Sequence, residues 1–418
     1  MPIKPKIMHK SNKNLWLIVL TGFIFIACGR DAGKKRMVDQ IKNDVYYLAG
    51  DQLEGREAGT EGETWAAKYI INRFRQMGLA PMGTGGSWMQ EFDFTVRKKT
   101  GDDSIAQKFK SKNVIGLINN KAANIVVIGA HYDHLGYGDD NSLYREGKEI
   151  HNGADDNASG TAVMMLLVEI LKKRNKNNNY LFIAFSGEEK GLYGSNYFVK
   201  NPTIDLKNVT YMINLDMVGR MKDSALVIYG TGTSPVWNDV IDSIKHKNIL
   251  IKKSESGVGP SDHTSFYLQD IPVLHFFTGQ HEDYHKPSDD ADKINYEGMY
   301  QVAGLIDSII TRLNDKPKLK FTRTRDQDSR QSPKFSVTLG VVPDYIFDGK
   351  GMRIDGISPD KPAEKAGLQK GDIVIQLGEI PVNDMMSYME ALGKFHKGDT
   401  TTATIVRNGK SMNFNIQF

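Results

Sequence analysis

Apolar positions along the chain form short runs separated by longer helical stretches. Runs of strand length lie at residues 125–129, 180–185, 209–215, 225–229 and 271–277. Residues 158–173 lie between the first two runs and are apolar almost all round, which predicts a buried helix. Two shorter helices are predicted earlier in the chain, near residues 38–48 and 61–77. Strands that alternate with helices predict an α/β fold in which helices cover both faces of a sheet.

The first 27 residues have the pattern of an export signal. Residues 1–14 carry four lysines and no acid, and residues 15–27 form an apolar run broken only by Thr21 and Gly22. Thirteen helical residues reach about 20 Å, which is short of the roughly 30 Å core of a bilayer, so a cleaved signal is favoured over a spanning helix. The run ends in Phe-Ile-Ala-Cys-Gly and resembles the lipobox of bacterial lipoproteins, which implies lipidation of Cys28. We therefore expect export across the inner membrane of a bacterium and a lipid-anchored periplasmic or outer-membrane protein, with an ordinary signal peptide as the alternative.

The remaining chain divides into two patterned regions. A polar stretch at residues 315–334, rich in charge and containing Pro317 and Pro333, is typical of a linker. The predicted organisation is a signal peptide (1–27), a tether (28–37), a large α/β domain (38–314), a linker (315–334) and a small C-terminal domain (335–418).

Composition narrows the possible chemistry. The net charge is only +4 over 418 residues, which argues against a nucleic-acid partner. Cys28 is the one cysteine, which excludes an internal disulfide, a thiolate zinc site and a C-x-x-C redox pair. Eight of the ten histidines lie between residues 131 and 285, where an even scatter would place about four. Any metal site in this chain must therefore use histidines and carboxylates.

Metal-ligating residue types follow directly after several predicted strands. His131, Asp133 and His134 follow the first strand, Glu188 and Glu189 the second, and Asp216 the third. The carboxyl ends of parallel strands meet at one edge of an open α/β sheet, so these side chains are expected to converge. Each motif alone has a structural explanation, such as a helix N-cap for Asp155-Asp156-Asn157. Their common edge favours a metal centre.

Seven motifs together resemble the di-zinc aminopeptidase family, which includes bacterial leucyl aminopeptidase and, more distantly, glutamate carboxypeptidase. The resemblance covers roughly residues 40–312. The motifs are L-E-G-R at 53–56, G-A-H-Y-D-H at 129–134, H-N-G-A-D-D-N-A-S-G at 151–160, S-G-E-E at 186–189, N-L-D-M-V-G-R at 214–220, S-D-H at 261–263 and D-Y-H-K-P-S-D-D at 283–290. The resemblance implies a three-layer α/β/α sandwich of the zinc-exopeptidase type with a mixed, mostly parallel sheet.

The resemblance also implies a ligand set for two zinc ions. Asp155 would bridge the ions, His131 and Asp216 would complete one site, and Glu189 and His285 would complete the other. One histidine and two carboxylates for each ion leave a position open for water, as in catalytic zinc sites. Cobalt or manganese would also suit these ligands, but imidazole in both sites favours zinc. A cis peptide bond between Asp155 and Asp156 is implied as well.

The family's chemistry is removal of N-terminal residues from peptides by a metal-bridging water. By resemblance, Glu188 would be the general base, Asp133 would orient His131, and Tyr284 would bind the oxyanion. Asp262 would lie just outside the ligand set, whereas His134, His151, His263 and His281 receive no role beyond loop hydrogen bonds.

The C-terminal region resembles PDZ domains. The motif is K-P-A-E-K-A-G-L-Q-K-G-D-I-V-I-Q-L-G at residues 361–378. Such domains bind an extended C-terminal peptide as an added strand, and the carboxylate loop would be Leu339-Gly340-Val341-Val342. Pro343 departs from the pattern because proline cannot donate a hydrogen bond to the added strand. Peptide capture and docking over the catalytic cleft both remain open.

Two other functions remain as alternatives. The first is a different reaction on the same metal centre, as in carboxypeptidases and glutaminyl cyclases of this fold. The second is a non-catalytic peptide-binding protein, as in relatives that have lost ligands. The complete five-ligand set together with Glu188 favours the aminopeptidase.

Overall fold

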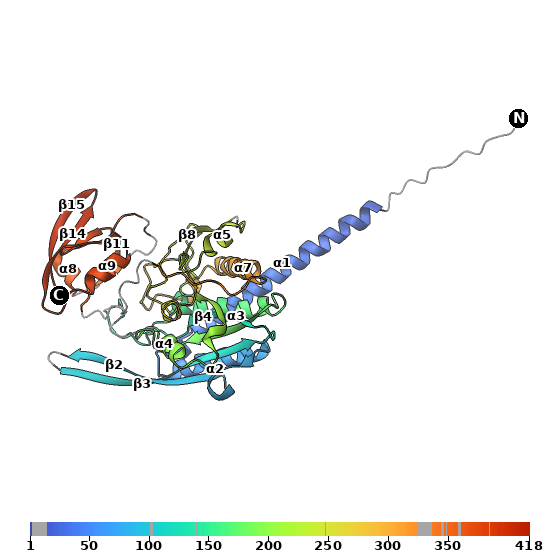
Figure 1. The fold of residues 1–418 in the computed structure, drawn as a ribbon, viewed down its shortest axis with the longest axis horizontal. Coiled ribbons are helices and arrows are strands. Elements are labelled where there is room, and N and C mark those ends of the chain that lie inside the picture. The colour runs from blue at the N-terminus through green and yellow to red at the C-terminus, as the bar shows by residue number, and fades with distance from the viewer. Residues whose placement is uncertain are drawn as a thin grey trace.

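The computed structural model describes most of the chain. Backbone is described for residues 1, 15–100, 103–138, 141–144, 146–246, 248–324, 337–343, 347, 349–357, 361–383 and 385–418. Within these ranges, side chains are described except at residues 15–31, 97–100, 103–106, 342, 355–356, 385–386 and 390. Figure 1 shows a large α/β body and a smaller β-rich lobe at the C-terminus.

A nine-stranded sheet runs through the described part of the large body, in the order β1-β3-β5-β4-β6-β9-β7-β8 with β2 paired to β3. The four central strands, β5, β4, β6 and β9, are parallel, whereas β3 and β7 pair antiparallel with this group. The strands are β1 (Ala80–Pro81), β2 (Met89–Thr100), β3 (Asp103–Ile118), β4 (Asn124–His131), β5 (Asn178–Phe185), β6 (Val209–Leu215), β7 (Ala225–Tyr229), β8 (Leu250–Lys253) and β9 (Val273–Phe277).

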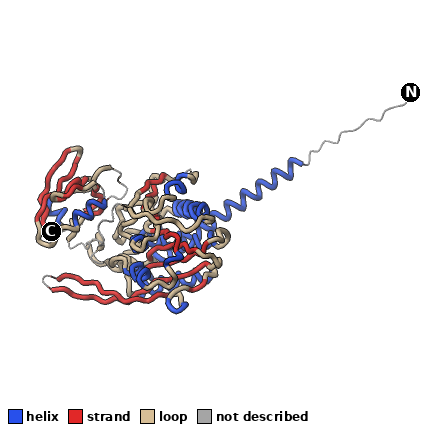
Figure 2. The backbone as a smooth tube through the Cα atoms, in the orientation of Figure 1, coloured by secondary structure: helices blue, strands red, loops and turns tan. Residues whose placement is uncertain are grey.

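Helices cover both faces of this sheet, as predicted. The helices of the body are α1 (Leu15–Leu48), α2 (Glu61–Gln76), α3 (Gly160–Leu171), α4 (Tyr193–Lys200), α5 (Trp237–Asp242), α6 (His263–Tyr267) and α7 (Tyr296–Leu313). Side chains of β4 alternate between two cores: Val126 and Ile128 pack in the core shared with α1, α2, α3, α5 and α7, and Val127 packs in the core shared with α4 and α6. The result is a three-layer α/β/α sandwich (Figure 2).

The five predicted strands and the buried helix are confirmed, with ends that shift by up to two residues. The long β2–β3 hairpin was not predicted. Its strands pair without interruption from Met89 opposite Val114 to Thr100 opposite Asp103, and the hairpin projects from the body in Figure 1.

The predicted tether continues a helix. In the structure α1 runs through residues 28–37 and projects from the body at its N-terminal end (Figure 1). Lys34 Nζ lies 2.6 Å from a carboxylate oxygen of Glu297, and Arg36 pairs with Glu169. The side chain of Cys28 lies outside the described residues. Among the described residues, no helix combines the length and apolarity that a bilayer crossing needs.

The first half of the predicted linker follows the surface of the body. The backbone N–H of Leu319 donates to Thr210 Oγ1, and that of Thr324 donates to the hydroxyl of Tyr267. Residues 325–334 lie outside the described part of the chain.

The C-terminal lobe has a six-stranded sheet in its described part, in the order β10-β11-β12-β14-β15 with β13 paired to β12. Its elements are β10 (Val341–Pro343), β11 (Met352–Ile357), α8 (Pro362–Ala366), β12 (Ile373–Leu377), β13 (Ile380–Pro381), α9 (Met385–Leu392), β14 (Thr400–Arg407) and β15 (Lys410–Gln417). Of the predicted carboxylate loop, Leu339 is buried in the core and Gly340 has a φ of 75°. The side chain of Val342 lies outside the described residues. β10 is an edge strand, and its register shifts between Val342 and Pro343.

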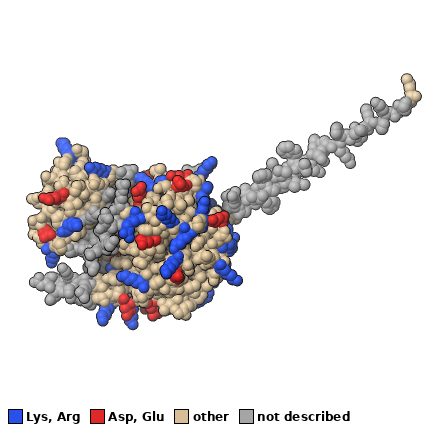
Figure 3. Space-filling model, viewed as in Figure 1, with Lys and Arg blue, Asp and Glu red and all other residues tan. Residues whose placement is uncertain are grey.

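Surface charge is mixed. On the face drawn in Figure 3, basic and acidic side chains are interspersed over both the body and the C-terminal lobe, in keeping with the net charge of +4.

Arg56 connects three segments that surround the functional edge of the sheet. Its buried guanidinium donates hydrogen bonds to the carbonyl oxygens of Leu48, Tyr132, Asn152 and Gly153, the last at 3.0 Å. Burial lowers the pKa of Arg56 to about 10, although nearby carboxylates oppose this shift. Arg56 therefore holds the end of α1, the residue after β4 and the loop before Asp155 together.

We expect Arg56→Met to lower the free energy of unfolding by more than about 3 kcal/mol, because each buried carbonyl left without a donor costs about 1–3 kcal/mol. Urea unfolding of the metal-free protein, followed by the fluorescence of its tryptophans, measures this loss. Arg75→Met, on the exposed side of α2, is the control and should change stability by less than about 0.5 kcal/mol. A loss below about 1 kcal/mol in Arg56→Met would show that these bonds do not stabilise the fold.

Candidate metal centre

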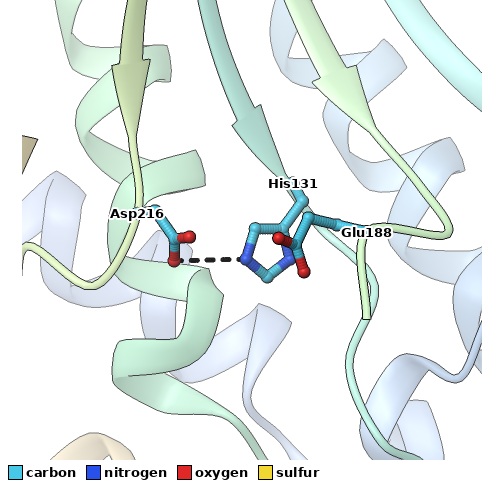
Figure 4. A group of neighbouring side chains, drawn as sticks. All are labelled: His131, Glu188 and Asp216. Atoms are coloured by element: carbon cyan, nitrogen blue, oxygen red, sulfur yellow. Dashed lines mark hydrogen bonds and ion pairs between the residues drawn. The ribbon is translucent and has the colours of Figure 1, made fainter. Parts of the chain in front are cut away.

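Three adjacent parallel strands deliver charged side chains to one edge of the sheet. His131 is the last residue of β4, Glu188 follows β5 within three residues, and Asp216 directly follows β6. Because β4 pairs in parallel with both β5 and β6, these ends lie side by side. In Figure 4 the three side chains point toward one another from separate strands. The predicted convergence at the carboxyl ends of the strands is therefore present.

Asp156 is the carboxylate at the centre of the cluster. Its Oδ1 lies 3.3 Å from His131 Nε2, and its Oδ2 lies 3.2 Å from His285 Nε2. Two more carboxylates complete the pattern: Asp216 Oδ1 lies 3.2 Å from His131 Nε2, and Glu189 Oε2 lies 3.3 Å from His285 Nε2. Each histidine therefore faces one oxygen of Asp156 and one oxygen of a further carboxylate.

This geometry corrects the predicted bridging residue. The carboxylate of Asp155 points away from the two ligand histidines: its Oδ1 accepts from the backbone N–H of Gly219 at 2.6 Å, and its Oδ2 lies 3.2 Å from His281 Nε2. The cis peptide bond likewise joins Asp156 to Asn157, one residue later than predicted. The two neighbouring aspartates are chemically identical, so only the direction of each side chain distinguishes them. The other four predicted ligands, His131, Glu189, Asp216 and His285, lie in the cluster.

The cluster has the donor atoms and the spacing that tetrahedral metal coordination needs. Zinc binds imidazole nitrogen and carboxylate oxygen at about 2.0–2.2 Å, so two ligand atoms on one tetrahedral ion lie roughly 3.3 Å apart. The four distances from Nε2 of the two histidines to the facing carboxylate oxygens are all 3.2 or 3.3 Å. Ligand-type atoms of His131, Asp156 and Glu189 also lie within 4.8 Å of one another, as do those of His131, Glu188 and Asp216. The chemistry and spacing of this donor set suit a tetrahedral metal ion such as zinc.

Backbone carbonyls orient both ligand histidines. His131 Nδ1 lies 3.2 Å from the carbonyl oxygen of Asp133, and His285 Nδ1 lies 2.9 Å from that of Asn141. A proton on Nδ1 satisfies each carbonyl and leaves the Nε2 lone pair free for a metal. The predicted partner of His131, the carboxylate of Asp133, is farther away, at 3.7 Å. The main-chain oxygen of Asp133 is therefore the nearer acceptor.

Three residues to which the sequence analysis gave no role at the metal site hold the side chains or the backbone of the cluster in place. His134 Nδ1 lies 2.7 Å from Glu189 Oε1 and fixes that carboxylate. Asp289 Oδ2 accepts from the backbone N–H groups of both Asp155 and Asp156, at 2.9 and 3.1 Å. His281 contacts Asp155. His134 and Asp289 belong to motifs already identified in the sequence, and His281 lies two residues before the motif at 283–290, so position in or beside a motif was the available signal.

The remaining predicted residues surround the cluster. Tyr284 stacks on the ring of His285, with centroids 3.8 Å apart, and lines a cavity beside Asp216. Asp262 is fully buried, and burial raises its pKa to about 7 while its charge interacts with His131 and Asp216. Glu188 remains partly exposed at the edge of the cluster.

The close spacing of carboxylates shifts several pKa values in the metal-free cluster. Burial raises the pKa of Glu188 well above its usual range, and the charges of Asp216 and Glu189 add to this rise. Burial alone would lower the pKa of His131, but the charges of Asp216 and Glu188 raise it well above its usual value. The pKa of Glu189 falls to about 2 because the attraction of His285 and His134 outweighs burial and the charge of Asp156. A site with this excess of negative charge favours cations.

Family comparison agrees with the geometry. Residues 113–310 match the model of peptidase family M28, and residues 310–418 match that of the PDZ domain. Nearly half of the chain, residues 113–310, is therefore similar to the peptidase domain of family M28. Its match to the aminopeptidase YwaD of Bacillus subtilis is 26% identical over 328 residues and covers 72% of this chain and 69% of the relative.

Solved structures of low sequence identity share the fold of the M28 domain. An aminopeptidase from Aneurinibacillus sp. strain AM-1 superposes with a TM-score of 0.54 at 19% identity, over 69% of this chain and 96% of that one. A glutaminyl cyclase of Bacteroides thetaiotaomicron superposes with a TM-score of 0.52 at 18% identity, over 65% of this chain and 97% of that one. The predicted α/β/α fold followed by a PDZ domain is thus confirmed.

Proposed function

We propose that this protein is a zinc-dependent aminopeptidase that removes N-terminal residues from peptides. The observation that carries the proposal is the placement of Asp156 between His131 and His285, each with a second carboxylate. His131, Asp156 and Asp216 would hold one zinc ion, and Asp156, Glu189 and His285 would hold a second. Zinc held there would supply Lewis-acid chemistry, lowering the pKa of a bound water and polarising the carbonyl group of the substrate.

Glu188 acts as general base and then as general acid. It sits at the end of β5, beside the ligand Glu189, and is partly exposed where a substrate would enter. Its carboxylate takes a proton from the attacking water and donates a proton to the nitrogen of the leaving peptide. Positioned acid–base groups of this kind supply about 10²–10⁴-fold in rate.

Tyr284 contributes its phenol to the same step. It stacks on His285 and lines the cavity beside Asp216. We assign it to hydrogen bonding with the oxygen of the carbonyl under attack. Asp133, His134 and Asp289 hold the ligands in place.

The flanking segments would place this activity at a membrane. Lipidation of Cys28 would anchor the protein to a bilayer after export, and α1 would carry the M28 domain at the end of that anchor. The PDZ domain offers the exposed edge of β10 to a C-terminal peptide, with Pro343 limiting the hydrogen bonds that the peptide can make. Docking of this domain against the peptidase body is the alternative use of the same surface.

Metal removal tests the proposal. We expect purified protein to contain close to two moles of zinc per mole of chain and to hydrolyse aminoacyl p-nitroanilides. Dialysis against a chelator should abolish turnover, and added zinc should restore it. Zinc content by mass spectrometry and release of nitroaniline measure both quantities. Full turnover by metal-free protein would overturn the proposal.

A further inference from the structure

A small cavity opens beside Asp216, and the walls of this cavity combine aromatic rings with polar atoms. Its volume is about 80 Å³, and its lining includes the rings of Tyr229, His263, His275 and Phe277. Since one water needs about 10–15 Å³ by the same measure, the cavity has room for a side chain of medium size. Asp216 and Tyr284 also line it, so it is continuous with the metal centre. Met217 and Pro260 also line it, and none of the described residues in the lining is leucine, isoleucine or valine.

His275 presents a hydrogen-bond donor to this cavity. The side-chain nitrogen of Asn214 lies 3.1 Å from His275 Nδ1 and also donates to Ser261 Oγ. An amide nitrogen can only donate, so His275 Nδ1 accepts and the ring carries its proton on Nε2. His275 Nε2 makes no hydrogen bond within the described part of the chain.

Further polar atoms around the cavity lack partners. The ring of His263 stacks on that of His275, with centroids 4.4 Å apart and planes 4° apart. His263 is fully buried, and both of its ring nitrogens lack a hydrogen-bond partner among the described residues, as does Gln280 Oε1. Buried polar atoms left without partners lower stability, so a ligand that pairs with them is favoured. The cavity therefore presents unpaired donors together with unpaired acceptors.

Charge limits which ligand can enter. Among the described residues that line the cavity there is no lysine or arginine, so no cationic side chain of the lining would pair with a substrate carboxylate. The one acid in the lining, Asp216, is engaged by His131 at 3.2 Å. A neutral group that both accepts and donates hydrogen bonds meets these conditions, and a primary amide has both functions.

We propose that this cavity receives the side chain of the N-terminal substrate residue and selects a carboxamide, asparagine or glutamine, over an aliphatic side chain of equal length. The carboxamide oxygen accepts from His275 Nε2, and its NH₂ group donates to Gln280 Oε1. This inference rests on the proposed aminopeptidase activity for its kinetic consequence. It assigns His275 and Gln280 as residues that determine specificity.

Matched substrates test the selection. We expect kcat/KM for glutaminyl p-nitroanilide to exceed that for the methionyl compound by at least about tenfold, and asparaginyl to exceed leucyl similarly, because a site built for a polar group rejects an analogue that lacks it. The glutamyl compound should be cleaved more slowly than the glutaminyl one. Mass spectrometry distinguishes released glutamine from a cyclised product that has lost ammonia. Equal or faster cleavage of the methionyl and leucyl compounds would overturn the proposal.

Two variants assign the selection to named atoms. His275→Phe keeps a ring to stack on His263 but removes the donor, and Gln280→Met removes the acceptor at similar length. We expect the glutaminyl-to-methionyl ratio to fall to within about twofold in His275→Phe and to fall partially in Gln280→Met, with zinc content unchanged. Unchanged ratios in both variants would refute the assignment.

Calorimetry separates failure of this inference from failure of the proposed function. Zinc-loaded protein should bind glutamine amide at least about tenfold more tightly than methionine amide, whether or not it hydrolyses any peptide. Absence of hydrolysis with this preference intact would overturn the aminopeptidase activity alone. Hydrolysis without the preference would overturn the carboxamide selection alone.

Discussion

Glu188→Gln is expected to lower kcat by about 10²–10⁴-fold while the protein retains its zinc, because the amide cannot take a proton from water. The variant preserves the shape of the side chain at the end of β5. Turnover of an aminoacyl p-nitroanilide and zinc content on the same sample together give the result. KM should change little, since the substitution removes proton transfer and leaves the binding surface intact.

The same variant distinguishes a base from a ligand. Glu188 lies close enough to His131 and Asp216 that the three could hold an ion by themselves. If Glu188 were a ligand, the variant would lose zinc together with activity. Glu282→Gln is a suitable control because Glu282 is exposed in the segment that carries His285, and it should keep activity within about twofold. Unchanged turnover in Glu188→Gln would assign the base to another residue.

Asp156→Asn is expected to weaken binding of both zinc ions by at least about 100-fold, because each proposed zinc site loses an anionic oxygen ligand. Replacing residues that only hydrogen-bond to metal ligands already lowers metal affinity by about 10–100-fold, and Asp156 would be a ligand itself. Activity should fall with metal occupancy. Isothermal titration calorimetry of the metal-free protein with zinc measures the affinity of both binding steps. Circular dichroism of the variant checks that the fold is intact.

Asp155→Asn is the matched control, and it distinguishes which of the two adjacent aspartates binds both ions. The same substitution one residue earlier changes a carboxylate that contacts Gly219 and His281 instead of the two ligand histidines. We expect Asp155→Asn to bind two zinc ions within about tenfold of the wild-type affinity. Loss of both ions in Asp155→Asn with normal binding in Asp156→Asn would restore the assignment made from sequence.

The positive charge of Arg56 and the hydrogen bonds of Asp289 stabilise the carboxylate cluster of the candidate metal centre. Arg56 interacts electrostatically with Asp133, Asp156 and Glu189 while bonding only to backbone carbonyls. Its charge therefore lowers the cost of gathering carboxylates before a metal binds, without occupying any carboxylate oxygen that the metals need. Asp289 complements it by holding the backbone of Asp155 and Asp156 in one orientation.

Much of the fold was determined by the order of residues along the chain. Apolar runs that alternate with helical stretches predicted the central strands and α3, since strands buried on both faces of a sheet are apolar at nearly every position. Ligand-type residues directly after these strands predicted one edge as the site, because parallel strands present their carboxyl ends together. The hairpin of β2 and β3 was not predicted from the sequence. Only part of it is buried against the body, so its strands lack a continuous apolar run.

Only the tertiary structure decided which side chains face the metals. Asp155 and Asp156 are adjacent and identical, and the backbone turn at residues 154–159 directs one toward His131 and His285 and the other toward Gly219. The parallel stacking of His263 on His275, from segments twelve residues apart, created a polar cavity that no local pattern indicated. Sequence motifs specify which residues gather at an edge, whereas side-chain direction depends on backbone geometry and packing among distant segments.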